Sequence, residues 1–234
     1  MGESEALSME SRRRIPTGSS GLDALLGGGA STGEVTLLYG EPGSGKTAVA
    51  LSAASQLLRF DPASRVVFID SDGKFSPDRL TQMTASKESL RRLRYVHPKT
   101  FEQQAEALDA LSVQLQPRDL AIVDSITGLY RVETGDTLKT FTENKELNRQ
   151  LGLVKEVAVT RDVAVVVTGQ VRSVLDSPVP AVEPVAPRLL RFWSDVVVKL
   201  ENTGVQGVKQ ASVEKPMRRR GAVRFTITQA GVRD

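Results

Sequence analysis

Short apolar runs recur along the chain and alternate with segments of helical pattern. The runs predict strands at 35–39, 65–70, 95–96, 120–123 and 163–168, and helix-forming segments lie at 46–58, 101–115 and 143–160. A strand that is apolar throughout keeps no face for water, which is typical of a parallel sheet covered on both sides. The pattern therefore predicts an α/β domain with a central, mostly parallel sheet flanked by helices.

The pattern changes near the end of the chain. Strands are predicted at 196–200, 207–214 and 222–228, with turns or basic residues between them. Polar and apolar residues alternate strictly over 223–228, as in an antiparallel strand with one face in water at the edge of a sheet. The segment 177–187 holds four prolines and is predicted to be an exposed loop without regular structure.

The start of the chain is polar. Residues 1–14 hold no apolar run and are expected to form a flexible leader, whereas glycines flank a short predicted helix around Leu22, Leu25 and Leu26. A chain of 234 residues can bury one sizeable core. We therefore expect a single domain over 15–234.

The composition limits the kinds of site and partner that the chain can have. The absence of cysteine and the single histidine, His97, exclude a disulfide framework and argue against thiolate or histidine metal sites. No run of about 18 apolar residues occurs, so we expect a soluble, cytoplasmic protein without a membrane partner. The formal net charge of +3 does not indicate nucleic acid by itself. The basic clusters 12–14 and 218–220 fit solvated surface charge as well as phosphate contact.

The strongest motif is the segment 40–47. Its sequence, Gly-Glu-Pro-Gly-Ser-Gly-Lys-Thr, matches the P-loop pattern G-x-x-x-x-G-K-[ST] and lies between a predicted strand and a predicted helix. Backbone N–H groups and the positive helix end can there surround phosphate oxygens, with Lys46 on the β- and γ-phosphates and the Thr47 hydroxyl on Mg²⁺. We predict binding of ATP with Mg²⁺. The predicted nucleotide-binding residues are Gly40, Glu41, Pro42, Gly43, Ser44, Gly45, Lys46, Thr47 and Ala48.

Other strand ends carry polar residues suited to hydrolysis. Asp124 follows the apolar run 120–123 and is predicted to orient the metal with Thr47, a helix cap being the alternative. Asp72 is the candidate that positions water, with Asp70 as the competing choice. Gln170 is predicted to sense the γ-phosphate through its amide, an ordinary loop residue being the alternative. The predicted catalytic residues are Lys46, Asp72 and Gln170.

Shorter motifs accompany the P-loop in a fixed order. They read PTG at 16–18, GLD at 21–23, LLGGG at 25–29, FSPDRL at 75–80, DSIT at 124–127, YR at 130–131, TGQV at 168–171 and FTIT at 225–228. This order resembles the archaeal RadB branch of the RecA/RadA recombinase superfamily. The resemblance covers nearly the whole chain after Arg14.

The resemblance implies a RecA-type P-loop ATPase core. ATP would lie at the carboxyl ends of the parallel strands, with Arg79 against the adenine, and two loops, 128–142 and 171–188, would face DNA. Binding would rest on phosphate neutralisation and depend steeply on salt. The expected DNA-binding residues are Arg131, Lys139, Arg172, Arg188, Lys215, Arg218, Arg219 and Arg220. The basic segment 215–220 could instead reach the ATP of a neighbouring subunit.

Aromatic rings near the two loops offer stacking surfaces for single-stranded bases. They are Tyr130, Phe141, Phe192 and Trp193, of which the last two suit the core equally well.

The chain also departs from its relatives. They usually carry Glu where Asp72 stands, and the shorter Asp would hold water less well, so we expect weak ATPase activity with DNA stimulation left open. They commonly carry Asn at the position of Gly169. Full recombinases have an N-terminal helical DNA-binding domain and a linker motif of the Phe-x-x-Ala type, which the segment 1–14 does not resemble. We therefore expect no stable filament, while smaller homo-oligomers are left open.

These features are compared with three functions. The resemblance favours a nucleoid-associated accessory protein of DNA recombination and repair that binds single-stranded DNA and assists a RadA-type recombinase. The alternative is a KaiC-like ATPase switch that regulates protein partners without binding DNA. A small-molecule kinase would need an acceptor pocket and a lid, and no segment beyond the P-loop fits one.

Overall fold

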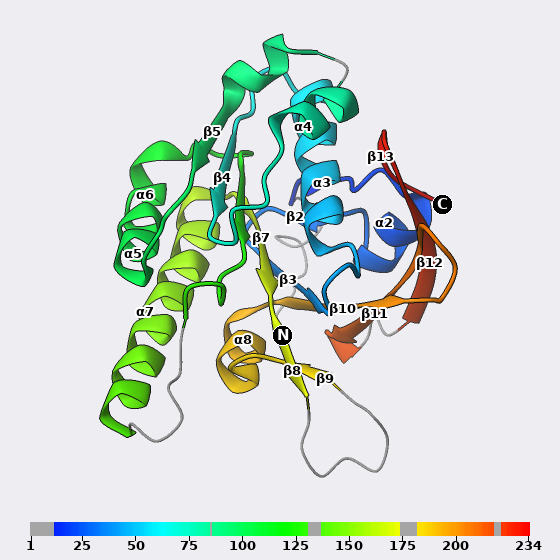
Figure 1. Ribbon diagram of the computed structural model, residues 1–234. Coiled ribbons are helices and arrows are strands. Elements are labelled where there is room, and N and C mark those ends of the chain that lie inside the picture. Colours follow the sequence, from blue (N-terminus) through cyan, green and yellow to red (C-terminus); the bar gives the residue numbers. More distant parts are fainter. Residues whose placement is uncertain (1–11, 85, 131–136, 174–181, 218–220) are drawn as a thin grey trace, which may run out of the picture.

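A large sheet forms the centre of the molecule (Figure 1). The computed structural model describes residues 12–84, 86–130, 137–173, 182–217 and 221–234. Within these residues the sheet has nine strands. In spatial order they are β5 (Leu93–Val96), β4 (Val66–Asp70), β6 (Leu120–Asp124), β7 (Ala164–Gly169), β3 (Val35–Gly40), β10 (Val196–Asn202), β11 (Val208–Lys215), β12 (Gly221–Thr228) and β13 (Gly231–Arg233).

Strand direction divides the sheet into two parts. The strands from β5 to β10 run parallel, whereas β11, β12 and β13 are antiparallel to their neighbours. This confirms the predicted mostly parallel sheet with antiparallel strands at its C-terminal edge. The expectation that the alternating strand lies at the very edge is wrong by one position, because the chain turns at Gly231 and β13 pairs outside β12.

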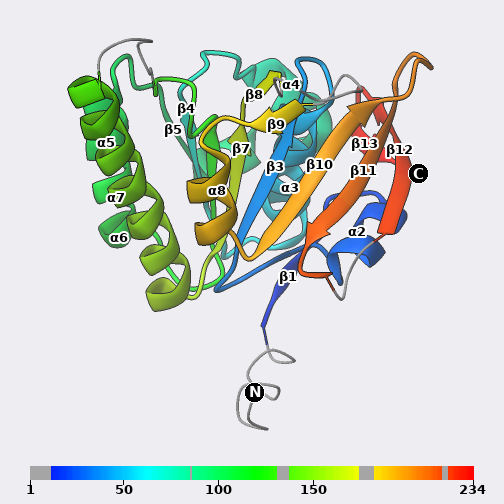
Figure 2. The same cartoon turned by 90° about the horizontal axis from the view of Figure 1, so that it is seen from below.

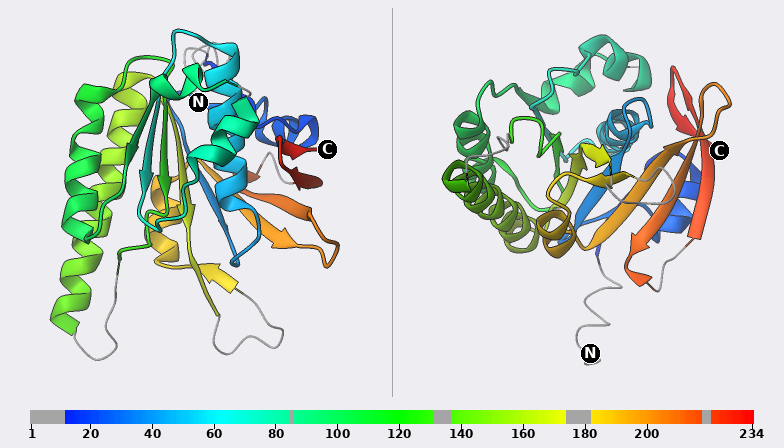
Figure 3. Two further views of the ribbon diagram at one scale, coloured as in Figure 1. Left: turned by 45° about the horizontal axis from the view of Figure 1, so that its top comes forward. Right: turned by 60° about the horizontal axis from the view of Figure 1, so that its bottom comes forward.

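Helices cover both faces of the sheet (Figures 2 and 3). One layer contains α2 (Ser20–Leu26), α3 (Lys46–Phe60) and α4 (Pro77–Thr84), followed by a short 3-10 helix (Glu88–Arg92). The other contains α5 (Phe101–Asp109), α6 (Leu111–Gln114), α7 (Thr137–Arg161) and α8 (Pro187–Trp193). Successive residues of one strand enter opposite layers, since side chains alternate across a strand. In β4, for example, Phe68 packs with α3 and Ile69 with the layer of α7.

Element boundaries follow local residues. Ser19 caps α2 by accepting a hydrogen bond from the Leu22 N–H, and Gly27 ends this helix with φ of 76°, a conformation that glycine adopts without strain. The predicted helix at 101–115 is divided at Ala110 into α5 and α6. The predicted helix at 143–160 begins earlier, at Thr137.

The proline-rich segment is partly regular. Residues Val182–Pro184 form β9, which pairs antiparallel with β8 (Val171–Ser173). The expectation that 177–187 lacks regular structure is therefore wrong for 182–184 and for Pro187, whose fixed φ suits the first position of α8. Pro184 is tolerated because it ends its strand. Residues 177–181 lie outside the described part of the chain.

Residues 12–14, which were expected to belong to a flexible leader, are part of the folded domain. Residues Arg14–Ile15 form β1, which pairs with β2 (Ala30–Ser31), and Arg12 lies 3.3 Å from Glu34. Arg13 forms an ion pair with Asp61. These three arginines are therefore held on the domain, while residues 1–11 lie outside the described residues. None of the helices described has the length and apolar character needed to cross a bilayer.

Candidate functional site

The P-loop lies where β3 ends and α3 begins. Gly45 is the N-cap of α3, has φ of 101° and provides no side-chain acceptor for the first N–H groups of the helix. Those N–H groups have no partner within the helix and can bind an anion. A Cβ on Gly45 would come within 2.8 Å of Ile227, whereas a Cβ on Gly43 would meet nothing within 4 Å. The loop is thus packed on one side and open on the other.

A cavity of about 610 Å³ lies on the open side of the loop. Its lining residues are Gly40, Pro42, Gly43, Gly45, Lys46, Thr47, Ala48, Asp72, Lys74, Asp124, Gln170 and Val171. The non-P-loop residues follow or end β4, β6 and β7, so the cavity lies at the carboxyl ends of the parallel strands, where open α/β sheets bind ligands. Its volume is within the range of small-molecule sites. Of the predicted binding residues, exposed Glu41 and buried Ser44 do not line it.

Lys46 points back over the loop. Its ammonium donates hydrogen bonds to the carbonyl oxygens of Gly40, at 2.7 Å, and Glu41, at 3.0 Å. Burial lowers the pKa of Lys46, and the charge of Lys74 lowers it further, while Asp124 and Asp72 act in the opposite direction. The ammonium is therefore held on the P-loop backbone at the cavity, within reach of the charges of Asp124 and Asp72.

Asp124 lies at the end of β6 between two threonine hydroxyls. The Thr47 hydroxyl donates to Asp124 Oδ2 at 2.6 Å, and the Thr168 hydroxyl donates to Asp124 Oδ1. Burial raises the pKa of Asp124, the two hydroxyls lower it, and the charges of Asp72 and Asp70 raise it. A bound cation would favour the ionised carboxylate.

The donor set at Thr47 and Asp124 fits Mg²⁺. Both supply oxygen, which Mg²⁺ prefers, and the two oxygens lie 2.6 Å apart. Among the residues that the structure describes, no group of three or more His, Cys, Asp or Glu side chains could hold a metal. A Mg²⁺ ion here would therefore take most of its ligands from phosphate and water, as is usual for this ion.

Asp72 carries three hydrogen bonds from different elements. Its Oδ1 accepts from the Ser125 hydroxyl at 3.0 Å and from the Gln170 amide at 3.2 Å, and its Oδ2 accepts from the Lys74 ammonium at 3.0 Å. Gly128 packs so closely that a Cβ there would overlap Asp72 Oδ1. The carboxylate thus has a defined orientation at the edge of the cavity.

The competing carboxylate, Asp70, forms its hydrogen bonds away from the cavity. It accepts hydrogen bonds from the backbone N–H groups of Lys74 and Phe75 and from the Tyr95 hydroxyl, and it does not line the cavity. Asp70 therefore shapes the loop that carries Asp72. The geometry favours Asp72 over Asp70 as the residue that faces a bound nucleotide.

Gln170 and Arg79 are placed differently relative to the cavity. Gln170 lines it, bonds to Asp72 and is held through its backbone N–H by the Thr127 hydroxyl. Arg79, on α4, donates to the Thr228 carbonyl at 2.7 Å and does not line the cavity. Arg79 thus lies against the end of β12, beyond the phosphate cradle.

Some residues of this site were not singled out from the sequence. Among them are Lys74, Gly128, Thr168 and Ile227. Lys74 could have been found from its position two residues after Asp72. The other three reach the site only through the pairing and packing of distant strands.

The Rad51 family model matches residues 10–234. The chain belongs to the Rad51 family. This match supports a general ATPase activity, as in other members of this RecA-type family, which use ATP with Mg²⁺, and a general role in DNA recombination or repair.

Individual relatives show which members of the Rad51 family the chain resembles. The DNA repair and recombination protein RadB of Methanosphaera stadtmanae is 31% identical over 226 residues, which cover 93% of this chain and 94% of that protein. The RadB protein of Methanothermobacter thermautotrophicus is 36% identical over 200 residues, which cover 82% and 83%. A crystal structure of the RadB recombinase is similar with a TM-score of 0.79 and 30% identity, covering 94% of this chain and 99% of that one. The resemblance to RadB proteins and the RecA-type fold are thereby confirmed.

A second cavity of this Rad51-family chain has a volume of about 930 Å³. It lies between α7, α8 and the β8–β9 ribbon. Its lining residues are Tyr130, Thr140, Phe141, Asn144, Lys145, Arg172, Val185, Ala186, Pro187, Arg188 and Leu189. The cavity therefore combines basic side chains with apolar and aromatic surface. Most of its lining residues fall within 128–142 and 171–188, the two segments that the resemblance places on DNA, while Asn144, Lys145 and Leu189 lie just outside them.

The aromatic candidates differ in exposure. Tyr130 is 8% exposed, packs edge-on against Phe101 and donates to Asn144, so its ring is not free for stacking. Phe141 and Phe192 are 68% and 72% exposed. Trp193 packs on α7 and donates its indole N–H to Asn148. Phe141 is the ring that combines exposure with a place in the second cavity.

The basic residues expected to bind DNA also differ in their surroundings. Arg172 and Arg188 line the second cavity, and Arg172 pairs with Glu183 at 2.8 Å. Lys215 donates to the carbonyl oxygens of Arg191 and Ser194, so the structure uses it to hold the end of α8. The remaining candidates cannot be placed: Arg131, Arg218, Arg219 and Arg220 lie outside the described residues, as does the side chain of Lys139.

Proposed function

We propose that the chain binds ATP with Mg²⁺ in the P-loop cavity and hydrolyses it slowly. The supporting observation is that Lys46, Thr47, Asp124, Asp72 and Gln170, chosen from separate motifs, line a single cavity at the carboxyl ends of the parallel strands. The N–H groups at the start of α3 and the Lys46 ammonium would bind the phosphates. Mg²⁺, when bound by Thr47 and Asp124, would neutralise charge on the β- and γ-phosphates.

Slow hydrolysis follows from the state of Asp72. Ser125 and Gln170 both donate to its Oδ1, which leaves only Oδ2 to accept a hydrogen bond from an attacking water. Its side chain is also one methylene shorter than Glu, which places the oxygens farther from the reacting centre.

The second cavity is the proposed contact for single-stranded DNA. Arg188 and Lys145 would neutralise phosphates, and Phe141 would stack on a base. Strand β8 connects the two cavities, because Gln170 and Val171 line the first and Arg172 lines the second. Loss of the γ-phosphate at Gln170 would thus change the position of β8 and of the DNA-contacting residues beside it.

The accessory role rests on the relatives. These relatives are named as DNA repair and recombination proteins, which supports placing this protein beside a RadA-type recombinase on nucleoid DNA. Assisting such a recombinase would require only ATP-dependent DNA binding, without a stable filament of this chain.

The test is a titration of fluorescent single-stranded DNA at two salt concentrations, with and without ATP, for the wild type and Lys46→Ala. We expect ATP-dependent binding that weakens steeply with salt and that loses its ATP dependence in Lys46→Ala. Absence of DNA binding at low salt, together with normal ATP binding, would favour the KaiC-like switch. Unchanged ATP binding by Lys46→Ala would reject the nucleotide site itself.

A further inference from the structure

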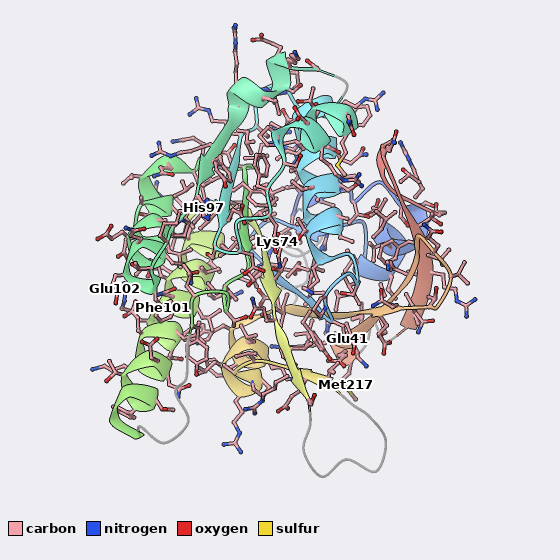
Figure 4. All side chains as sticks on the ribbon, in the orientation of Figure 1. Glu41, Lys74, His97, Phe101, Glu102 and Met217 are labelled. Atoms are coloured by element: carbon pink, nitrogen blue, oxygen red, sulfur yellow. The ribbon has the colours of Figure 1, made fainter. Side chains whose placement is uncertain are left out.

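Lys74 is a second lysine at the nucleotide cavity. It lies on the loop after β4, while Glu41 marks the P-loop after β3, and both are labelled in Figure 4. Lys74 lines the cavity together with Lys46 and donates to Asp72 at 3.0 Å. The P-loop pattern includes one lysine, Lys46, so the pattern does not explain why Lys74 also lies at the cavity.

The Lys74 side chain is exposed, whereas the Asp72 side chain is held by several donors. The side chain of Lys74 is 65% exposed, and within the described residues its ammonium donates to Asp72. Asp72 is 10% exposed and keeps two further donors, Ser125 and Gln170. Departure of Lys74 would therefore leave Asp72 oriented by these two, with Oδ2 released.

We propose that Lys74 recognises the γ-phosphate by exchanging partners. Without a triphosphate the ammonium pairs with Asp72 and occupies Oδ2. When a γ-phosphate enters the cavity, the ammonium bonds to its oxygens, and Oδ2 becomes available to accept a hydrogen bond from water. Lys74 thereby links recognition of the triphosphate to release of the water-positioning carboxylate.

The electrostatics of the cavity agree with this exchange. A γ-phosphate adds negative charge beside Asp72, so the Asp72 carboxylate and the phosphate would compete for the same ammonium. The Lys74 side chain is largely in solvent, where water weakens the attraction between opposite charges, so this pair is more easily broken than one buried on both sides. A charge-assisted bond to phosphate is stronger than a neutral one, which favours the exchange.

The inference rests on the proposed nucleotide site, and nucleotide binding tests it without relying on turnover. Affinities for Mg²⁺-ADP and for a non-hydrolysable Mg²⁺-ATP analogue are measured by fluorescence with the wild type, Lys74→Ala and Lys74→Arg. Lys99→Ala is the matched control, since Lys99 lies on the neighbouring loop beside His97 and does not line the cavity.

We expect Lys74→Ala to bind the ATP analogue about tenfold more weakly, equivalent to about 1.4 kcal/mol, and ADP within about twofold of wild type. Lys74→Arg should retain most of the preference, and Lys99→Ala all of it. An equal loss for both nucleotides, or an unchanged ratio of affinities, would overturn the proposal, because a residue that only holds Asp72 would not distinguish them.

Asp72→Asn supplies the second readout. Asp72→Asn removes the carboxylate that competes for Lys74, so it should increase affinity for the ATP analogue but not for ADP. In the double variant Asp72→Asn with Lys74→Ala, the gain in affinity should be smaller, because Lys74 is no longer there to bind the γ-phosphate. A gain of the same size in both backgrounds contradicts the exchange. If the wild type binds neither nucleotide, the proposed function fails; if it binds both and only the Lys74 effects are missing, this inference alone fails.

Discussion

The Thr47 hydroxyl donates a 2.6 Å hydrogen bond to Asp124 Oδ2 across 77 positions of sequence. Thr47 belongs to the first turn of α3 and Asp124 ends β6, which is separated from β3 by β7. The bond therefore exists only when the sheet is assembled in this order. It joins the phosphate-binding loop to the buried carboxylate that would orient a metal.

Burial of Asp124 should reduce the stability of the metal-free protein. Because burial raises its pKa above the usual 3.8, its contribution to the free energy of unfolding is fully present below pH 3.8 and is lost as pH rises through the folded-state pKa. Asp124→Asn cannot ionise and its amide can bond to the same two hydroxyls. We expect the variant to be more stable than the wild type at pH 7 without metal, with the difference shrinking toward pH 4.

Urea denaturation in chelator at several pH values measures this difference. Glu106→Gln, at an exposed position of α5, controls for removal of a carboxylate. If the difference in free energy of unfolding between the wild type and Asp124→Asn is the same at pH 7 and pH 4, burial of Asp124 does not reduce the stability of the protein.

Gly128→Ala should reduce turnover while nucleotide binding persists. Its Cβ would overlap Asp72 Oδ1 and displace that carboxylate, and a displacement of about 1 Å can lower a rate by as much as about a hundredfold. We expect a loss of about tenfold or more in phosphate release. Gly152→Ala is the control, because its Cβ would make ordinary contact, 3.4 Å from Trp193. Full activity of Gly128→Ala would mean that Asp72 does not position water.

Much of the nucleotide site could be predicted from the sequence. The P-loop is a contiguous motif, and Asp124 ends a run so apolar that burial was evident. The sequence favoured Asp72 but left Asp70 as the competing choice, because both lie at the end of the same strand. Their roles differ only through distant partners: Tyr95 for Asp70, and Ser125 and Gln170 for Asp72.

The remainder depends on contacts between remote elements. Ile227 on β12 packs against Gly45 although β10 and β11 lie between β12 and β3 in the sheet, and no local pattern predicts that. Lys215 belongs to a basic segment, yet its ammonium holds the end of α8. Charge in a sequence indicates where cations are, but the fold decides whether they remain available.

Asp72→Glu should raise turnover. The longer side chain brings the carboxylate closer to the γ-phosphate and weakens its short-range pairing with Lys74, so a water would be better held. We expect a rise of several-fold in phosphate release at saturating ATP, with about 0.8 kcal/mol corresponding to a factor of four. Nucleotide affinity measured on the same variant controls for binding. An equal or lower rate contradicts the water-positioning role.

Phe141 and Arg188 should contribute differently to DNA binding. Phe141→Ala should weaken binding to single-stranded DNA by about 1–3 kcal/mol at every salt concentration, as loss of base stacking does. Arg188→Ala should lower the slope of log affinity against log salt by about 0.7, the value for one phosphate contact on a single strand. Salt titrations by fluorescence anisotropy measure both.

Phe60→Ala is the matched control for the stacking effect. Phe60 is as exposed as Phe141, at 68%, but ends α3 away from the second cavity. Equal effects of the two phenylalanine substitutions, or an unchanged salt slope in Arg188→Ala, would remove the second cavity from the DNA contact.

The central claim is that the P-loop cavity holds a triphosphate with Mg²⁺, and a crystal structure with a non-hydrolysable ATP analogue tests it most directly. The account predicts phosphates bonded to the N–H groups at the start of α3 and to the Lys46 ammonium, with a metal ion on the Thr47 hydroxyl beside Asp124. A fully bound analogue elsewhere on the molecule, with this cavity empty, would contradict it.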